Sequence, residues 1–214
     1  MKGKETKAGP RQGIRNYLYI LEPNTFAMIT PATFVYLLWL FSEIVLNRVM
    51  RGSSSDKTRK DSGSLVIIWI VIIVSIIAAG NIAALNRTPI APSYQTMLYA
   101  GLGIILLGIV LRLAAVLSLG QFFTVSVRIR EGHQVKKDGM YKYVRHPSYA
   151  ASLLSFVGYG ISLNNWISLA VGVIPVFAAF LYRMNVEEKV LLENFGSEYS
   201  EYMARTKRLL PFVY

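Results

Sequence analysis

Long apolar runs separated by short basic segments dominate the sequence. Residues 65–85 contain neither a charge nor a proline, and a helix needs about 20 such residues to cross the hydrocarbon core of a bilayer. Residues 26–46 form a second apolar run with Glu43 near one end, and residues 97–119 form a third run that Arg112 interrupts. Each of these three runs predicts a membrane-spanning helix.

Two shorter apolar runs follow, at residues 149–163 and 166–182, with Asn164 and Asn165 between them. The asparagine pair is typical of a tight turn, so the two runs predict a helical hairpin, and Pro175 predicts a kink in its second arm. Short segments of this kind are tolerated at membrane depth where protein surrounds them. We therefore predict an all-α integral membrane protein with about five transmembrane helices, the last two forming a short hairpin.

Beyond the hairpin the apolar positions recur with helical spacing instead of running continuously. Residues 183–205 predict C-terminal helices on the cytoplasmic side: one that leaves the membrane and stops at Gly196, and a second, short one capped by Ser197. At the other end of the chain, residues 1–24 form a basic tail, in which residues 14–21 predict a short interfacial segment.

Composition narrows the class of protein. Charged residues make up 16% of the chain and hydrophobic residues 53%, whereas soluble domains carry about 25% charged residues. The absence of cysteine excludes disulfides, thiolate metal sites and cysteine nucleophiles, and two histidines are too few for a histidine-built metal site; no metal is expected. The net charge of +11 flanks the apolar runs, which favours membrane lipids over nucleic acid as the partner.

The distribution of Lys and Arg predicts the orientation. Loops 47–64 and 120–148 are rich in basic residues, whereas loop 86–96 contains Arg87 as its one basic residue. Five spans would put the two basic loops on one side together with the C-terminus, and the positive-inside rule makes that side cytoplasmic. The basic N-terminal tail would then lie outside, so either the later loops overrule the tail or the span count differs from five.

Two groups of charged residues border the hairpin. Arg145-His146-Pro147 precedes its first arm, and Glu187-Glu188 follows its second arm. The first group is typical of a juxtamembrane anchor with proline at the first helical position, and the second of a solvated helix face. Alternatively, both groups contribute to a polar pocket at the membrane surface. Taken singly, the residues leave both interpretations open.

The order of the motifs along the chain is more specific than any one of them. The motifs are Gly132-His133-Gln134-Val135, Gly139-Met140-Tyr141, Arg145-His146-Pro147-Ser148-Tyr149 and, after the hairpin, Arg183, Glu187-Glu188, Leu191 and Phe195-Gly196-Ser197-Glu198-Tyr199. This series resembles the isoprenylcysteine carboxyl methyltransferase family, which belongs to a wider group of membrane methyltransferases that includes phospholipid N-methyltransferases. The resemblance covers residues 108–214 and implies that they form the catalytic region with the cofactor pocket, preceded by the tail at 1–24 and by N-terminal transmembrane helices and a polar loop at 25–107.

The resemblance implies an S-adenosylmethionine-dependent enzyme that binds its cofactor between the loop before the hairpin, the hairpin and the C-terminal helices. Its acceptor would be the carboxylate of an isoprenylcysteine-like lipid-modified molecule. Carried over to this sequence, the catalytic positions are Arg183 and Glu187, and the cofactor-binding positions are His133, Gln134, Val135, Gly139, Tyr141, Arg145, His146, Pro147, Tyr149, Glu187 and Glu188. A phospholipid N-methyltransferase is the alternative within the group, and a non-catalytic membrane transport or scaffold module is the alternative from another class.

The residue types suit methyl transfer to a carboxylate. The reaction is an in-line displacement that depends on aligning two reactants and excluding water, and a carboxylate acceptor needs no general base. An arginine such as Arg183 can hold a carboxylate through its planar fork. An amine acceptor would need a base, for which His146, the glutamate pair or Tyr149 are the available groups.

Overall fold

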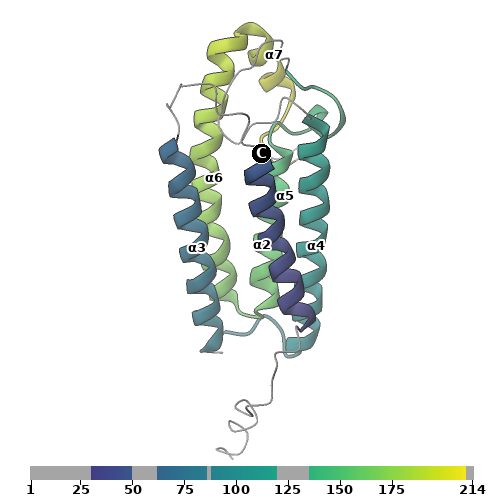
Figure 1. Cartoon of the computed structure of the whole chain (residues 1–214), viewed down its shortest axis with the longest axis vertical. Helices are drawn as coiled ribbons and strands as arrows, with labels where there is room; N and C mark the ends of the chain where they lie inside the picture. The colour runs from purple at the N-terminus through teal and green to yellow at the C-terminus, as the bar shows by residue number, and fades with distance from the viewer. Residues whose placement is uncertain (1–29, 50–61, 86–87, 120–134, 211–214) are drawn as a thin grey trace, which may run out of the picture.

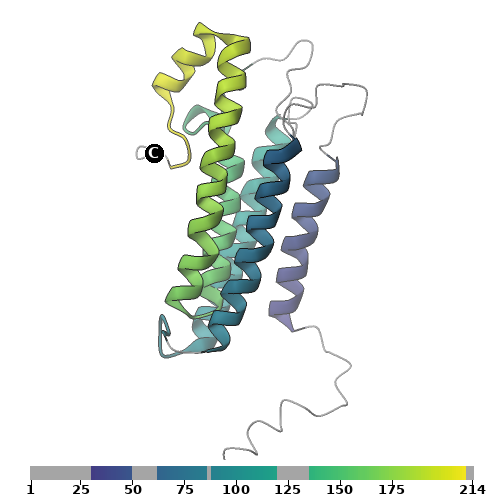
Figure 2. The same cartoon turned by 90° about the vertical axis from the view of Figure 1, so that its left-hand side faces the viewer.

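The computed structural model describes residues 30–49, 62–85, 88–119 and 135–210. Within these ranges five long helices stand side by side and a short helix, α7, crosses one end of the bundle (Figures 1 and 2). The tail at 1–24, with the predicted interfacial segment, lies outside the described residues. The helices are α2 (Pro31–Val49), α3 (Ser62–Ala84), α4 (Tyr94–Leu119), α5 (Pro147–Ser162), α6 (Trp166–Phe195) and α7 (Ser197–Arg205), with a 3₁₀ turn, η2 (Gly139–Lys142), before α5.

The prediction of an all-α membrane protein is confirmed. Among the described residues, three helices are long and apolar enough to cross a bilayer, namely Leu65–Ala84, Tyr94–Leu119 and Trp166–Phe195. The apolar part of α2, Pro31–Leu46, is shorter, and α5 has 16 residues, fewer than the ~20 that span the hydrocarbon core. The count of about five spans therefore stays a prediction.

The two arms of the predicted hairpin are α5 and α6, and the asparagine pair forms the turn between them. Asn164 adopts a positive φ of 48°, and its side-chain oxygen accepts hydrogen bonds from the backbone of Ile90 at 3.1 Å and Ala91 at 2.9 Å. Asn165 caps α6 by accepting a hydrogen bond from Ser168 N at 2.9 Å. The turn is thus built by the two asparagines and tied to the segment that leads into α4.

Helix α6 is longer than the hydrocarbon core of a bilayer is thick. Its 30 residues measure about 45 Å at 1.5 Å per residue, against a hydrocarbon core of about 30 Å. The helix continues through Pro175 and ends at Gly196, whose φ is 51°. Gly196, rather than Ser197, is the N-cap of α7, which corrects the predicted cap: glycine accommodates the positive φ at this junction, so Ser197 becomes the first residue of the helix.

Helices α4 and α5 pack in very close contact. A side chain at Gly101 would overlap the backbone at Gly158, and one at Gly108 would lie 2.9 Å from Ala151 O and overlap the Ser155 hydroxyl. Small residues that allow backbones to approach are characteristic of helix packing in membranes. This close contact fixes α5, and with it the residues at the start of α5, relative to α4.

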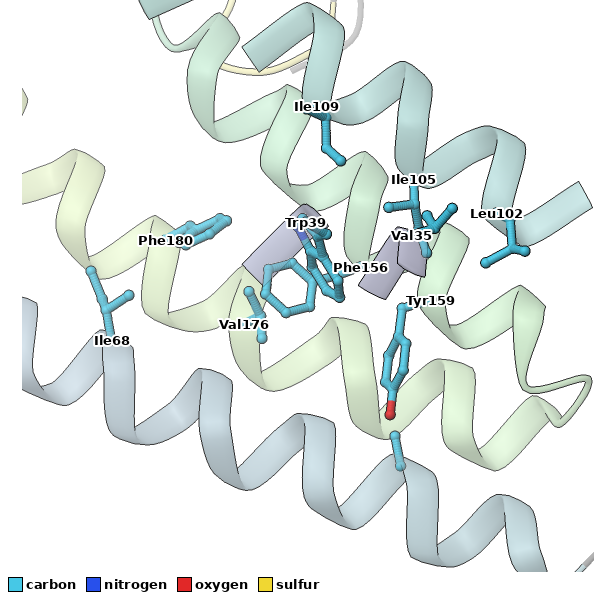
Figure 3. Close-up of a cluster of buried hydrophobic side chains, with 11 residues drawn as sticks. Val35, Trp39, Ile68, Leu102, Ile105, Ile109, Phe156, Tyr159, Val176 and Phe180 are labelled. Carbon is cyan, nitrogen blue, oxygen red and sulfur yellow. The ribbon is translucent and has the colours of Figure 1, made fainter. Parts of the chain in front are cut away.

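Aromatic rings join three of the helices (Figure 3). Trp39 of α2 packs edge-on against Phe156 of α5 at 4.9 Å between ring centroids, and Phe156 packs against Phe180 of α6 at 6.4 Å. Large apolar side chains elsewhere face outward, including Ile70, Val74 and Ile77 of α3 and Leu117 of α4. Such an apolar exterior is expected of a surface in contact with lipid.

The bundle has two distinct ends. Helices α2, α4 and α6 finish, and α3 and α5 begin, at the end that carries α7, whereas segment 88–93 lies at the opposite end (Figures 1 and 2). The helix ends that border the basic loops 47–64 and 120–148 therefore lie at the same end of the bundle as α7. This agrees with the relative sidedness predicted from their charge.

Candidate functional site

The candidate site lies at the end of the bundle that carries α7, where three segments converge. The loop before α5 pairs with the chain after α7 through a parallel bridge between Val144 and Lys207. Arg145 N donates to Lys207 O at 2.8 Å, His146 N donates to Arg208 O at 3.0 Å, and Lys207 N donates to Tyr143 O at 3.2 Å. The last turns of α6 approach the same ladder.

His146 contacts both of the predicted acidic residues. It is 7% exposed and occupies the N-cap position of α5, immediately before Pro147 at the first helical position. Its Nε2 lies 3.1 Å from Glu188 Oε1, and its Nδ1 lies 3.6 Å from Glu187 Oε2. One imidazole ring therefore faces both carboxylates, and the loop before α5 meets α6 at this point, as the resemblance implies.

Glu188 is held by two arginines as well as by the histidine. Its Oε1 accepts from Arg145 Nε at 2.9 Å, and its Oε2 accepts from Arg208 Nη2 at 2.6 Å. Burial raises the pKa of the Glu188 carboxyl, but the hydrogen bonds from His146, Arg145 and Arg208 outweigh burial and lower that pKa to about 2. Glu188 is therefore ionised, with both oxygens engaged by protein groups.

Glu187 has a different environment from its neighbour. Its Oε2 is buried and has no hydrogen-bond partner among the described residues, and its distance of 3.6 Å from His146 Nδ1 exceeds hydrogen-bond length. A buried carboxylate oxygen without a donor is costly. The site thus offers an acceptor that a ligand with N–H or O–H groups would satisfy.

Arg183 and Tyr149 lie next to these acids on the two arms of the hairpin. Arg183 is completely buried one helical turn before Glu187, and its guanidinium is hydrogen-bonded to Tyr149. The Tyr149 ring lies 5.7 Å from the His146 ring and 5.2 Å from the Phe180 ring. The structure therefore gathers Arg183, Tyr149, His146 and Glu187 into one group.

Tyr141 forms a fixed wall of the site. Its hydroxyl donates to Ala115 O of α4 at 3.3 Å, and its carbonyl accepts from the Tyr202 hydroxyl of α7 at 2.6 Å. Burial raises the pKa of both the Tyr141 and the Tyr202 hydroxyl, so both remain neutral donors. Gly139, two residues earlier, has a positive φ of 56° at the start of η2.

The other predicted cofactor positions fall before η2 and beside α7. Val135 is half-buried in the segment that leads to η2, whereas His133 and Gln134 lie outside the described residues. Arg145 donates from Nη1 to Met203 O at 3.0 Å and also to Thr206 O. These are carbonyls at the C-terminal end of α7, where a cation is favourable, so Arg145 supports the loop as well as Glu188.

Two interactions, one in the candidate site and one between α2 and α4, were not predicted. Arg208 enters the site from the chain after α7, and its position next to Lys207 in the sequence resembles a generic basic pair. Glu43 of α2 forms an ion pair of 2.8 Å with Arg112 of α4. Opposite charges in two predicted spans are the signal that would have found this second pair, since charged residues in membrane helices usually face one another.

Comparison with known proteins identifies the same region. Residues 101–193 match the family model described as the isoprenylcysteine carboxyl methyltransferase family. That interval begins in α4, includes Arg145, His146, Glu187 and Glu188, and ends before Arg208.

Several curated proteins are similar in sequence. Protein-S-isoprenylcysteine O-methyltransferase B of Arabidopsis thaliana is 38% identical over 115 residues, which cover 53% of this chain and 58% of that protein. A probable protein-S-isoprenylcysteine O-methyltransferase of Oryza sativa subsp. indica is 33% identical over 127 residues, covering 58% and 66%. The Saccharomyces cerevisiae enzyme is 33% identical over 125 residues, covering 56% and 52%. The chain thus spans between half and two thirds of the length of these relatives.

The fold is similar to that of a solved eukaryotic intramembrane Ras methyltransferase, an isoprenylcysteine carboxyl methyltransferase. The two structures superpose with a TM-score of 0.60 over 92% of this chain and 71% of the other, at 23% sequence identity. The family match over residues 101–193 confirms the resemblance for the motifs within that interval, and the solved structure shows a similar fold.

Proposed function

We propose that this chain, whose residues 101–193 match the isoprenylcysteine carboxyl methyltransferase family, is an S-adenosylmethionine-dependent membrane methyltransferase that esterifies the carboxylate of an isoprenylcysteine-like lipid-modified acceptor. The observation that carries the proposal is the convergence of His146, Glu187 and the buried Arg183 at one end of an apolar bundle. This arrangement gathers polar and ionisable side chains next to the apolar helices.

The residues present fit the cofactor. The unsatisfied Glu187 Oε2 can accept hydrogen bonds from an ammonium or from ribose hydroxyls, and the His146 ring beside it adds a second polar contact. The predicted cofactor positions Val135, Gly139 and Tyr141 belong to the segment before α5, on the same side of the site. When bound, S-adenosylmethionine supplies an electrophilic methyl group on a sulfonium that already carries its leaving group.

Arg183 is suited to the acceptor carboxylate. A buried guanidinium presents a planar fork of N–H donors that matches two carboxylate oxygens, and Tyr149 fixes its orientation by hydrogen bonding to it. Holding both reactants in line and excluding water can contribute about 7–11 kcal/mol to lowering the barrier. Since a carboxylate attacks as the anion, no residue needs to remove a proton.

The membrane setting suits a lipid-modified acceptor. Its chain would lie among the apolar helices while the soluble cofactor enters at the polar end beside α7. Two basic loops lead to this end, which favours a cytoplasmic orientation under the positive-inside rule. The helical bundle would then comprise about five membrane segments, with α5 and α6 as a hairpin.

Incubating the purified protein with radiolabelled S-adenosylmethionine tests the proposal. We expect label to pass to a farnesylcysteine analogue, and Arg183→Lys to reduce turnover because a lysine cannot form the two-point contact. Arg205→Met, at an exposed position of α7, is the matched control and should retain activity. Labelling of an ethanolamine phospholipid in place of the farnesylcysteine analogue would contradict the proposed acceptor, and failure to label either acceptor or a membrane extract would contradict the enzyme assignment.

A further inference from the structure

We propose that Arg208 is a positioning residue of the cofactor pocket, which acts by holding Glu188 as a structural counter-ion and so leaves Glu187 as the carboxylate that binds the ligand. The inference rests on the proposed function, because the ligand is taken to be S-adenosylmethionine or its product. It separates the roles of two adjacent acids that the motif alone treats as equivalent.

Glu187 and Glu188 differ in their hydrogen bonds. Glu188, whose side chain is 4% exposed, accepts from Arg145, His146 and Arg208 at 2.9, 3.1 and 2.6 Å. Glu187 is more exposed, at 20%, and its Oε2 accepts no hydrogen bond from the described residues. Of the two acids, Glu187 is therefore the one that a ligand donor can approach without displacing a hydrogen bond seen here, whereas on Glu188 it would have to displace a protein group.

The backbone fixes Arg208 in place. The parallel pairing of the segments around Val144 and Lys207 carries hydrogen bonds of 2.8 to 3.2 Å. Arg145 extends from one of these segments to Glu188 Oε1, and Arg208 extends from the other to Glu188 Oε2. Glu188 is thus clamped from both segments, and its charge is met by two permanent cations.

The contacts of Glu188 with Arg145 and Arg208 determine the orientation of the His146 ring. With Glu188 neutralised by Arg145 and Arg208, its Oε1 holds His146 Nε2 and turns Nδ1 toward Glu187. Without Arg208, Glu188 Oε2 would be buried without a partner, which favours rotation of the carboxylate toward the remaining donors, Arg145 and His146. The His146 ring would then no longer hold its Nδ1 toward Glu187. Arg208 therefore acts on the ligand indirectly, through Glu188 and His146.

The test measures the affinity of the full-length protein, in detergent or nanodiscs, for S-adenosylhomocysteine by calorimetry, and the KM values for cofactor and farnesylcysteine analogue. We expect Arg208→Met to weaken cofactor binding by about 10- to 100-fold, the range typical of partners that orient ligand-binding groups, with the acceptor KM unchanged. Arg208→Lys should recover part of the loss, and Arg205→Met should bind like the wild type.

A double-variant comparison identifies the route of the effect. In a Glu188→Gln background, Arg208→Met should change affinity less than about twofold, because variants that act through one group are not additive. Glu187→Gln should weaken binding further in that same background. If Arg208→Met does not fold, the variant that combines Glu188→Gln with Arg208→Met is compared with Glu188→Gln alone, because this combination leaves no carboxylate at position 188 without a partner.

Three results would overturn the inference. The first is an Arg208→Met variant that binds S-adenosylhomocysteine as tightly as the wild type, and the second is a loss of affinity from Arg208→Met that is as large in the Glu188→Gln background as in the wild type. The third is an acceptor KM that rises together with the cofactor KM. Absence of S-adenosylhomocysteine binding in the wild type would refute the proposed function and the inference with it. Normal wild-type binding with an unaffected Arg208→Met variant would refute the inference alone.

Discussion

Replacing Glu43 by glutamine is expected to destabilise the helical bundle, because Arg112 would lose its ion-pair partner among apolar helices. The two side chains are 2.8 Å apart and are 13% and 16% exposed, respectively. They come from α2 and α4, so the pair joins helices that are far apart in the sequence. The amide of glutamine keeps the size of the side chain and removes its charge, which isolates the electrostatic contribution.

The magnitude follows from the burial of the pair. Breaking a buried pair by removing one partner costs about 3–5 kcal/mol, and an isolated charge at the centre of a membrane helix costs about 2.5–3.5 kcal/mol. Because both groups retain some exposure, we expect Glu43→Gln to lower the free energy of unfolding by about 3 kcal/mol. Replacing both partners, as in Glu43→Gln with Arg112→Met, should cost less than about 1 kcal/mol, since no charge is left unpaired.

The assay is equilibrium unfolding of the four proteins of this double-mutant cycle, followed by circular dichroism in mixed micelles. Glu193→Gln, at an exposed position of α6, controls for the loss of a carboxylate and should be neutral. The reasoning would be refuted by a Glu43→Gln variant as stable as the wild type. It would also be refuted by a double variant as unstable as the single one.

Three further predictions concern packing, capping and pH. Gly108→Leu should lower the thermal stability by about 1–3 kcal/mol and weaken cofactor binding, because its side chain would push α4 away from Ser155 of α5; an unchanged melting temperature would contradict the close packing. Asn165→Ala should cost about 1 kcal/mol in thermal unfolding by removing the acceptor for Ser168 N, and Asn165→Asp should retain most of that stability. The Glu188 pKa is lowered from 4.5 to about 2, so its interactions stabilise the fold above pH 4.5 and are lost as the pH falls toward 2. Glu188→Gln should remove that acid-dependent loss from a pH series of unfolding measurements, and an identical pH series would refute the assignment.

Local chemistry explains which parts of the fold were predictable. The asparagine turn and the stop at Gly196 depend on a few neighbouring residues, so both can be identified from the sequence. The apolar runs likewise locate the helices because lipid imposes a simple requirement on each of them. The cap of α7 differed by one residue because the backbone angle at the junction, rather than side-chain preference, selects Gly196 for that position.

The site was less predictable because it depends on contacts between distant residues. Arg145 and Thr206 are 61 positions apart in the sequence, and no local pattern indicates that their segments pair. Glu187 and Glu188 are adjacent in the sequence, yet Glu188 is enclosed by cations and Glu187 keeps an oxygen that accepts no hydrogen bond from the described residues. The resemblance predicts that both acids belong to one site, whereas the direction of each side chain is given only by the three-dimensional arrangement.

The pairing of residues 143–146 with residues 206–208 has a consequence for biosynthesis. During translation the ribosome makes all five long helices before it makes the segment that supplies Lys207 and Arg208. The bundle can therefore insert into the membrane and pack while Glu188 still lacks one of its cations. A chain interrupted before residue 206 would therefore retain these helices, whereas Glu188 would lack its ion pair with Arg208.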